Sequence, residues 1–343
     1  MEEKKDTLGM LDLVIRPGFC VKENQIIKVN QAAESLFITP GTDVRSLLLT
    51  GSEEYAAFTG GCLYLTLNLS SHSCGASVTR VDDIDVFLLE QESDNGELRS
   101  MALAARELRE PLTNVMITAD SLFPLCAAES SPRTAEQVAR LNRGLFQILR
   151  IIGNMSDAER CAAVSHQETA DIPALFAEFF EKAETLVSHT GITLTYEGPN
   201  QPIYGLADRE QLERAVLNIL SNAIKFTPKG GTVTAKLTRS GRMLRLSVTD
   251  SGSGIAQSVR SSVFSRYGIG LGMVLIRTAA AHHGGAVLID QPEGVGTRIT
   301  MTMSIRQSKQ ATLRSNVLRV DYAGERDHGL IELSECLPTE LYE

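Results

Sequence analysis

The sequence predicts an α+β protein made of several domains. Short alternating apolar segments separated by turns come first, two long helical patterns follow, and helix and strand signals then alternate. Alternation with a period of two predicts strands, whereas apolar residues three and four apart predict helices. We therefore expect a small α+β domain at 1–92, an antiparallel two-helix hairpin at 97–163, a two-layer α/β sandwich at 168–306 and a tail at 307–343.

The composition argues against several classes of function. The 343 residues carry a formal net charge of -9, and an acidic surface disfavours binding to nucleic acids or anionic membranes. No stretch approaches the roughly 18–20 apolar residues of a membrane span, and the charged start Met1–Asp6 is unlike a signal peptide. The six cysteines are scattered without a CxxC pair, as expected of reduced thiols. We expect a cytoplasmic protein with no membrane span and no nucleic-acid partner.

The first domain has the pattern of a small antiparallel sheet with short helices. β-Branched residues and alternation predict the strands, and Asn30–Phe37 predicts a short helix after the first of them. The polar segment Gln91–Gly96 predicts a break and a domain boundary. The predicted strands are Ile26–Val29, Gly61–Leu69, Ala76–Val81 and Asp85–Leu89.

The apolar residues of the two long helices alternate at spacings of four and three, which is the seam of a coiled coil or helix bundle. The connection Ala127–Arg133 is short, so the helices should run antiparallel. A lone hairpin buries only one stripe on each helix, so we expect a homodimer with a four-helix bundle. The alternative is that the hairpin packs on domains of its own chain. The seam residues are Met101, Ala105, Leu108, Leu112, Val115, Ala119 and Leu122, and then Val138, Leu141, Leu145, Ile148, Ile152 and Met155.

Helices and a mixed sheet in the third domain predict the two-layer sandwich. The predicted helices are Ile172–His189, Arg209–Lys225 and Leu271–His283. The predicted strands are Thr193–Tyr196, Thr232–Leu237, Met243–Thr249, Ala286–Ile289 and Thr297–Ile305. In the tail, strand-like runs at Val317–Tyr322 and Gly329–Leu333 predict added strands at a sheet edge.

Three polar residues share one face of the predicted helix Arg209–Lys225. Asn218, Asn222 and Lys225 are four and three residues apart, so their side chains project from the same side. Two amide oxygens and one ammonium suit a hydrated Mg²⁺ beside a polyphosphate, because Mg²⁺ prefers oxygen ligands and keeps several waters. A polar outer helix face is the alternative interpretation of this segment alone.

Two glycine-containing motifs follow. Asp250 ends an apolar strand in the pattern DxGxG, where a carboxylate can accept a hydrogen bond from an amine such as that of adenine and the glycines allow a close backbone approach. The run from Gly268 to Gly272 opens the next helix, so its N–H groups and the helix dipole favour phosphate. Thr297 then starts a strand and can present a hydroxyl to the base. Each motif alone is common, and their combination is specific.

In this order and spacing the motifs resemble the catalytic domain of sensor histidine kinases, which has the Bergerat ATP-binding fold of the gyrase, Hsp90 and MutL group. The resemblance covers roughly residues 172–305. It implies bound ATP and Mg²⁺, with Asn222 as metal ligand, Lys225 on phosphate and Asp250 on the adenine amine. Further nucleotide contacts are implied for Asn218, Phe226, Gly252, Gly254, Gly268, Gly270, Leu271, Gly272 and Thr297.

Asn218 stands where the hydrolysing relatives have a glutamate base. An amide cannot take a proton from water, so phosphoryl transfer is favoured over ATP hydrolysis.

The segment from Ala104 to Leu112 in the first long helix resembles the H box of the same family. Arg106 occupies the phosphoacceptor position, and a guanidinium has no free lone pair with which to attack a phosphate. Glu107, the base beside that position, is present, whereas Glu110 replaces a threonine that positions water for dephosphorylation. Two interpretations of Arg106 stay open: drift at an exposed position, or a contact to nucleotide phosphates or an acidic partner.

Residues 18–34 and the later strands resemble a PAS sensor domain. Together these resemblances imply a homodimeric, cytosolic sensor-histidine-kinase homologue of a two-component system, which docks a response regulator on its bundle. One alternative is a regulatory pseudokinase that uses ATP only to set its conformation. The other is a serine kinase of the anti-sigma-factor type, against which the bundle seams count.

Overall fold

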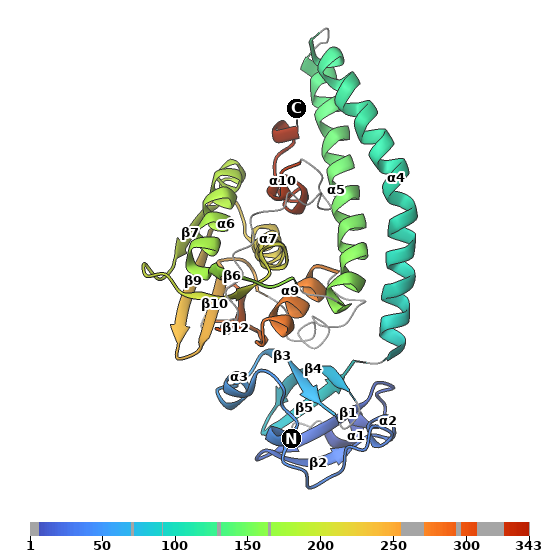
Figure 1. Cartoon of the computed structure of the whole chain (residues 1–343), viewed down its shortest axis with the longest axis vertical. Helices are drawn as coiled ribbons and strands as arrows, with labels where there is room; N and C mark the ends of the chain where they lie inside the picture. Colours follow the sequence, from blue (N-terminus) through green and yellow to red (C-terminus); the bar gives the residue numbers. More distant parts are fainter. Residues whose placement is uncertain are drawn as a thin grey trace, which may run out of the picture.

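The computed structural model describes residues 7–69, 72–90, 92–128, 132–163, 166–254, 271–292, 296–306 and 326–342. Figure 1 shows an N-terminal domain at one end of the molecule, two long helices along one side and an α/β domain beside them. The C-terminal segment lies between helix α5 (Pro132–Ala163) and helix α7 (Arg209–Phe226).

The N-terminal domain is an antiparallel sheet surrounded by short helices. Its elements are α1 (Thr7–Leu11), β1 (Gly18–Lys22), β2 (Gln25–Val29), α2 (Gln31–Glu34), η1 (Val44–Ser46), α3 (Ser52–Ala56), β3 (Cys62–Asn68), β4 (Ser73–Val81) and β5 (Ile84–Leu89). The strand order is β2-β1-β5-β4-β3, with Phe19 stacked on Phe87 at 4.7 Å between ring centroids in the core. The buried Asn30 caps α2, because its Oδ1 accepts hydrogen bonds from Gly18 and Ala33. The predicted strands and helix are confirmed, and β1 is an addition.

Helix α4 (Glu92–Ala128) and α5 pack along their lengths as the predicted hairpin. The predicted break at Gln91–Gly96 is wrong, because α4 begins at Glu92. Five of the thirteen predicted seam residues are buried inside the chain, namely Ala105, Leu112, Ala119, Leu145 and Ile152. Val138 and Met155 are partly buried. The other six are exposed, and they recur every seven residues on each helix: Met101, Leu108, Val115 and Leu122, and then Leu141 and Ile148. This exposed set is hereafter the open seam.

The α/β domain has the expected two kinds of layer, with helices packed on a mixed sheet. Its helices are α6 (Ile172–Val187), η2 (Ser188–Thr190), α7 and α9 (Leu271–His282), and its main strands are β7 (Thr193–Glu197), β9 (Thr232–Ser240), β10 (Met243–Asp250), β11 (Val287–Asp290) and β12 (Arg298–Ser304). The order is β11-β12-β10-β9-β7. Among the described strands only β7 pairs in parallel, with β9, since helix α7 provides the crossover between them. A separate antiparallel pair, β6 (Glu168–Asp171) with β8 (Tyr204–Ala207), was not predicted.

The two sheets are joined into one sheet of ten strands. Strand β3 of the N-terminal domain pairs antiparallel with β11, with Leu63 opposite Leu288. The junction is reinforced by Arg277 of α9, which is buried, forms an ion pair of 2.6 Å with Glu90 and lies over the ring of Tyr64. The N-terminal domain therefore contacts the α/β domain directly as well as through the hairpin.

The C-terminal segment differs from the prediction of added strands. Residues 329–332 belong to helix α10 (His328–Glu332), which Asp327 caps through a hydrogen bond from Leu330 N, and η3 (Thr339–Tyr342) follows. Val317–Tyr322 lies outside the described residues. The apolar side chains of this segment recur at three- and four-residue spacing, and here that spacing outweighed the β-strand pattern.

Arg277→Met tests the junction between the two sheets. We expect the free energy of unfolding to fall by about 1–2 kcal/mol, because the ion pair to Glu90 and the contact with Tyr64 are both lost. Denaturant unfolding measures this, with the exposed Arg242→Met as control. Hydrogen exchange should also quicken at the β3–β11 pairing, and unchanged exchange there would show that Arg277 does not hold the domains together.

Candidate functional site

Helix α7 carries the central part of the site. It begins after Asp208, whose Oδ1 accepts a hydrogen bond of 3.1 Å from Gln211 N, and ends at Phe226. Its apolar residues, including Leu212, Val216 and Ile219, are buried, so the orientation of the helix is determined by packing. The polar residues Arg214, Asn218, Ser221, Asn222 and Lys225 lie along another side, hereafter the polar stripe of α7.

Asn218 is nearly fully buried, with 1% of its surface exposed. Its Nδ2 donates to Arg214 O at 2.9 Å, whereas its Oδ1 has no hydrogen-bond partner within the described part of the chain. A Cβ at Gly272 would lie 2.5 Å from this oxygen, so Asn218 can keep this position only with glycine at 272. A buried acceptor without a donor is costly, and a hydrated cation placed there would satisfy it.

Asn222 and Lys225 continue the stripe towards solvent. Asn222 is half-buried, and its Nδ2 lies 3.8 Å from Met273 Sδ at the start of α9. Lys225 is exposed and pairs with Glu335 at 3.1 Å. The neighbouring Phe226 is also exposed, which leaves its ring free to cover a flat ligand.

Asp250 ends β10 and is buried beside the stripe. Its Oδ1 accepts hydrogen bonds from Gly252 N at 2.8 Å and Thr297 N at 3.2 Å. Burial raises the pKa of this carboxyl above its ordinary value, and the two backbone hydrogen bonds lower it by less. The buried carboxylate is thus a fixed acceptor on the floor of the site.

The glycines around Asp250 are required by close backbone contacts. A Cβ at Gly252 would collide with Phe226 O, and Gly254 and Gly296 both have positive φ, of 74° and 91°. These contacts bring the ends of α7 and β10 and the start of β12 together. Leu271 and Gly272 begin α9 beside Asn218, whereas Gly268 and Gly270 lie outside the described residues.

The H-box residues lie apart from this group. Arg106 and Glu107 are exposed on α4, and α5 lies between α4 and α7 in Figure 1. Within the described ranges, no hydrogen bond or ion pair joins either side chain to the polar stripe of α7. The expected solvation of Arg106 is therefore confirmed, and the sequence contains no histidine in α4 or α5 that could replace it.

Charged residues that sequence reasoning missed complete the surroundings of the stripe. Arg214 is buried and donates to Asn154 Oδ1 at 2.6 Å and to Glu332 at 3.1 Å. Arg150 of α5 donates to Ser221 Oγ at 3.2 Å. One feature of the sequence could have indicated these charged contacts: Glu332 lies between Ile331 and Leu333, and a charge inside an apolar run usually needs a buried partner.

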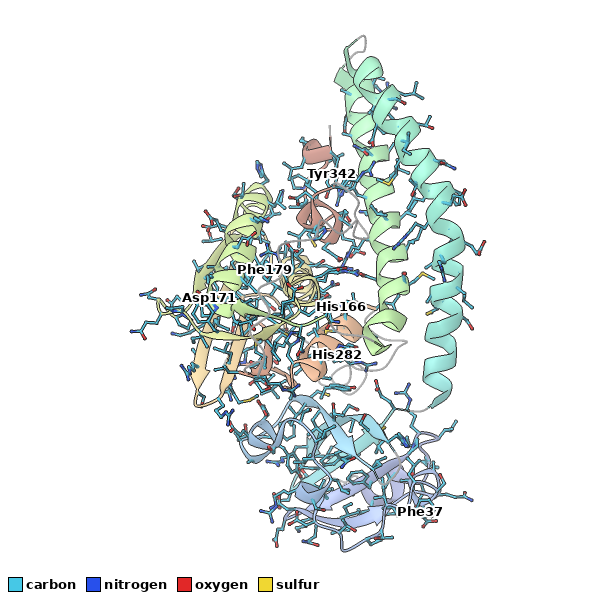
Figure 2. All side chains as sticks on the ribbon, in the orientation of Figure 1. Phe37, His166, Asp171, Phe179, His282 and Tyr342 are labelled. Atoms are coloured by element: carbon cyan, nitrogen blue, oxygen red, sulfur yellow. The ribbon has the colours of Figure 1, made fainter. Side chains whose placement is uncertain are left out.

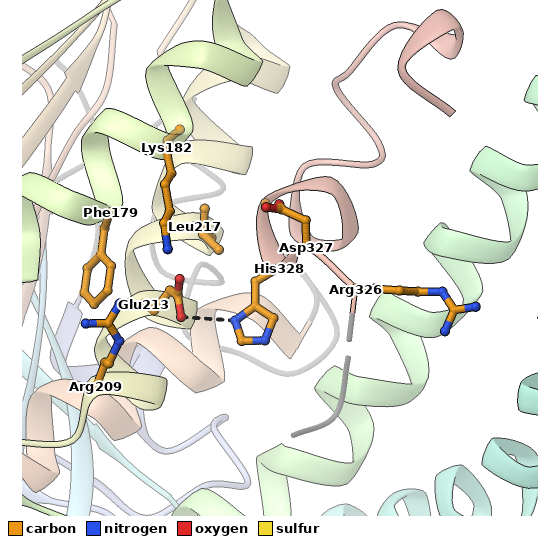
Figure 3. A pocket seen from close by; sticks show the side chains of 10 residues that line it. Phe179, Lys182, Arg209, Glu213, Leu217, Arg326, Asp327 and His328 are labelled. Carbon is orange, nitrogen blue, oxygen red and sulfur yellow. Dashed lines mark hydrogen bonds and ion pairs between the residues drawn. The ribbon is translucent and has the colours of Figure 1, made fainter. Parts of the chain in front are cut away.

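A cavity of about 250 Å³ lies between α6, α7 and the start of the C-terminal segment (Figure 3). Across it His328 Nδ1 lies 3.0 Å from Glu213 Oε2. On its rim Arg209 pairs with Glu178, and the hydrogen bonds from Arg209 and Lys182 lower the pKa of Glu178 to about 2. Asn218, Asn222, Lys225 and Asp250 do not line this cavity.

The donor set fits Mg²⁺ bound together with a polyphosphate. Across the described ranges, no group of three or more histidine, cysteine or acidic side chains forms a metal centre by itself. A hydrated Mg²⁺ does not need one, because amide oxygens, phosphate oxygens and water complete its shell. Asn218 and Asn222 are the residues that would hold it.

No helix in the described part of the chain combines the length and the apolar character that crossing a bilayer requires.

Residues 207–307 match the family model of histidine kinase-, DNA gyrase B- and HSP90-like ATPases. A sensor-like histidine kinase of Rhizobium meliloti is 29% identical over 73% of this chain and 52% of its own length. The adaptive-response sensory kinase SasA of Synechocystis is 27% identical over 69% of this chain and 68% of its own. The chain thus spans about half the length of the rhizobial relative.

One solved structure, full-length ShkA in complex with AMPPNP, has a similar fold. It superimposes with a TM-score of 0.51 at 24% identity, over 62% of this chain and 47% of the other.

Asp250→Asn tests the electrostatics of the site. The folded-state pKa of Asp250 is raised, so its charged form costs stability above that pKa and the cost disappears as the pH falls below the ordinary value. We expect the variant to be at least as stable as the wild type at pH 7, with the difference shrinking towards pH 4. Denaturant unfolding across this range measures it. A variant that is clearly less stable at pH 7 would show that the hydrogen bonds to the charge outweigh burial.

Proposed function

We propose that this sensor histidine kinase relative, whose Bergerat-fold domain belongs to the family of histidine kinase-, DNA gyrase B- and HSP90-like ATPases, binds Mg–ATP in a two-component pathway without a phosphoacceptor histidine of its own. The observation that carries the proposal is the buried Asn218 Oδ1, which lacks a partner in the described residues and faces Gly272.

The surrounding residues support the same assignment. Asp250 offers a buried acceptor to the adenine amine, and the exposed ring of Phe226 lies at the end of α7 beside it. Lys225 contributes an ammonium group to the stripe and would neutralise phosphate charge. Asn218 and Asn222 would hold Mg²⁺, which supplies charge neutralisation for the phosphates. With an amide at position 218 there is no carboxylate base to activate water.

The arginine at position 106 leaves two candidate functions. In the first, the chain is a histidine kinase homologue that still binds nucleotide but, without an acceptor histidine, phosphorylates nothing on its own hairpin. The exposed position of Arg106 on α4 favours a second candidate as well, a regulatory pseudokinase in which nucleotide sets the conformation. The serine kinase alternative is disfavoured by the long hairpin, whose open seam has no role in it.

The partners follow from the hairpin. We propose that the open seam pairs with that of a second copy to form a four-helix bundle, and that a response regulator docks on the bundle. Leu108, Val115 and Ile148 are each about half exposed, and large apolar residues repeated every seven positions are unfavourable in water.

A phosphorylation assay separates the candidates. Purified chain, Arg106→His and the control Arg106→Gln are incubated with labelled Mg–ATP. We expect acid-labile label on Arg106→His only, because the imidazole restores a nucleophile beside Glu107. Label on all three would mean an unidentified acceptor, and label on none would favour the regulatory pseudokinase. Acid-stable label on an added partner would favour the serine kinase.

Binding of Mg–AMPPNP tests the site itself. Calorimetry should detect binding to the wild type, and Asp250→Asn should weaken it about tenfold or more, since an amide N–H₂ would face the adenine amine. Asp82→Asn, an exposed change in the N-terminal domain, is the control and should bind normally. Equal binding by Asp250→Asn would remove Asp250 from the nucleotide site.

Val115→Lys tests the open seam. A charge at the dimer interface should dissociate the bundle and lower the mass measured by sedimentation to that of one chain. Thr113→Lys, on an exposed position outside the seam, is the matched control and should leave the dimer intact. A wild-type protein that sediments as a monomer would refute the bundle.

A further inference from the structure

The C-terminal segment Arg326–Tyr342 packs on the polar stripe of α7, against Lys225, which we propose to contact the nucleotide phosphates, and Asn218, which we propose to help hold Mg²⁺. Figure 1 shows α10 between α5 and α7, and α10 also contacts α6. This segment is not part of the ATPase family match, which ends at residue 307.

Glu332 reaches the buried end of the stripe. Its side chain is 0% exposed. Its Oε2 accepts a hydrogen bond of 3.2 Å from Asn218 Nδ2, and its Oε1 lies 3.1 Å from Arg214 Nε. Arg150 of α5 is 3.4 Å from the same carboxylate. A carboxylate with two hydrogen-bond donors and a second guanidinium beside it occupies the kind of environment that also binds phosphate oxygens.

Glu335 occupies the exposed end in the same way. It pairs with Lys225 at 3.1 Å and with Arg150 at 3.3 Å. Burial raises the pKa of this carboxyl, but Lys225 and Arg150 lower it by more, so the net pKa is below its usual value. The two glutamates therefore contact Arg214 and Lys225, at opposite ends of the polar stripe, and Glu332 also contacts Asn218.

Helix α5 holds the segment in place. Arg143 Nε donates to Ser334 O at 2.8 Å, and Gln147 Nε2 donates to the same oxygen at 3.2 Å. Tyr342, which is labelled beside α5 in Figure 2, packs edge-on against Phe146 at 5.2 Å between centroids. Ile331, Leu333 and Leu337 are fully buried. The segment is thus a specific docked element with its own apolar anchor.

We propose that the C-terminal segment is a built-in competitive inhibitor, in which Glu332 and Glu335 occupy Asn218 and Lys225, the side chains proposed for Mg²⁺ and phosphate, until Mg-bound nucleoside triphosphate displaces them. The inference rests on the nucleotide site proposed above. Because both glutamates also pair with Arg150, the docked segment ties the ATP-binding domain to α5. Its release would free that domain to move relative to the hairpin. Since the inhibitor belongs to the same chain, it competes at a high effective concentration.

The test compares the affinity for Mg–AMPPNP by calorimetry in full-length variants. Glu335→Gln removes the exposed pair and should tighten binding about threefold, as expected for a half-exposed ion pair. Glu332→Gln with Glu335→Gln should tighten it about tenfold or more, because a buried charged hydrogen bond is also lost. Glu340→Gln, an exposed acid in the same segment without a contact to the stripe, is the matched control and should leave affinity unchanged.

Hydrogen exchange gives an independent measurement. Saturating Mg–AMPPNP should remove protection from the amides of residues 330–337 in the wild type, and thermal unfolding should confirm that the Glu335→Gln fold is intact. Nucleotide that binds while these amides stay protected, or affinity that does not rise in either glutamine variant, overturns the inhibitor and leaves the nucleotide site standing. If no variant, including the double one, binds nucleotide, the proposed function fails and the inhibitor with it.

Discussion

A buried cluster of charges determines how the three helical parts of this molecule meet. Arg214 on α7, Arg150 on α5 and Glu332 on α10 are all withdrawn from water, and charges in that setting are tolerated only when each has partners in good geometry. Removing Glu332 would deprive Arg214 of its buried carboxylate and Arg150 of one of the two carboxylates that it pairs with. The C-terminal segment, the hairpin and the α/β domain are therefore interdependent, although α10 and α5 are far apart in the sequence.

The same cluster explains why one side of α7 is so polar. The apolar side packs on the sheet, as in any amphipathic helix, and the opposite side would ordinarily be solvated. Here that side is covered, so Asn218 and Arg214 have lost water and acquired protein partners. Asn218 Oδ1 has no hydrogen-bond partner among the described residues. A ligand that donates to this oxygen or coordinates it would therefore gain binding free energy.

The N-terminal domain is joined to the α/β domain by backbone pairing as well as by α4. Strand β3 continues into β11, and Arg277 fixes the junction from α9, the helix whose first residues border the proposed nucleotide site. A rearrangement in either domain would strain this pairing. The junction thus offers a short connection between the N-terminal domain and the proposed site, separate from the hairpin.

The sequence by itself determined the local elements and the composition of the site. The spacing of Asn218, Asn222 and Lys225 requires that they share a helix side, and an aspartate after a buried strand requires a polar strand end, so α7 and Asp250 were predictable. The heptad spacing of α4 and α5 likewise predicted the hairpin, but not which part of the seam, Ala105 and Leu112 or Leu108 and Val115, the chain itself would bury.

Only the tertiary structure decided the long-range pairings. The β3–β11 junction joins two strands whose patterns are complete without each other, so nothing local specifies it. The residues 329–332 resemble a strand in isolation and become helical because Ile331 and Leu333 find apolar neighbours and Glu332 finds Arg214. A charge-to-charge contact across more than one hundred residues depends on where packing places both helices, and local periodicity carries no information about that.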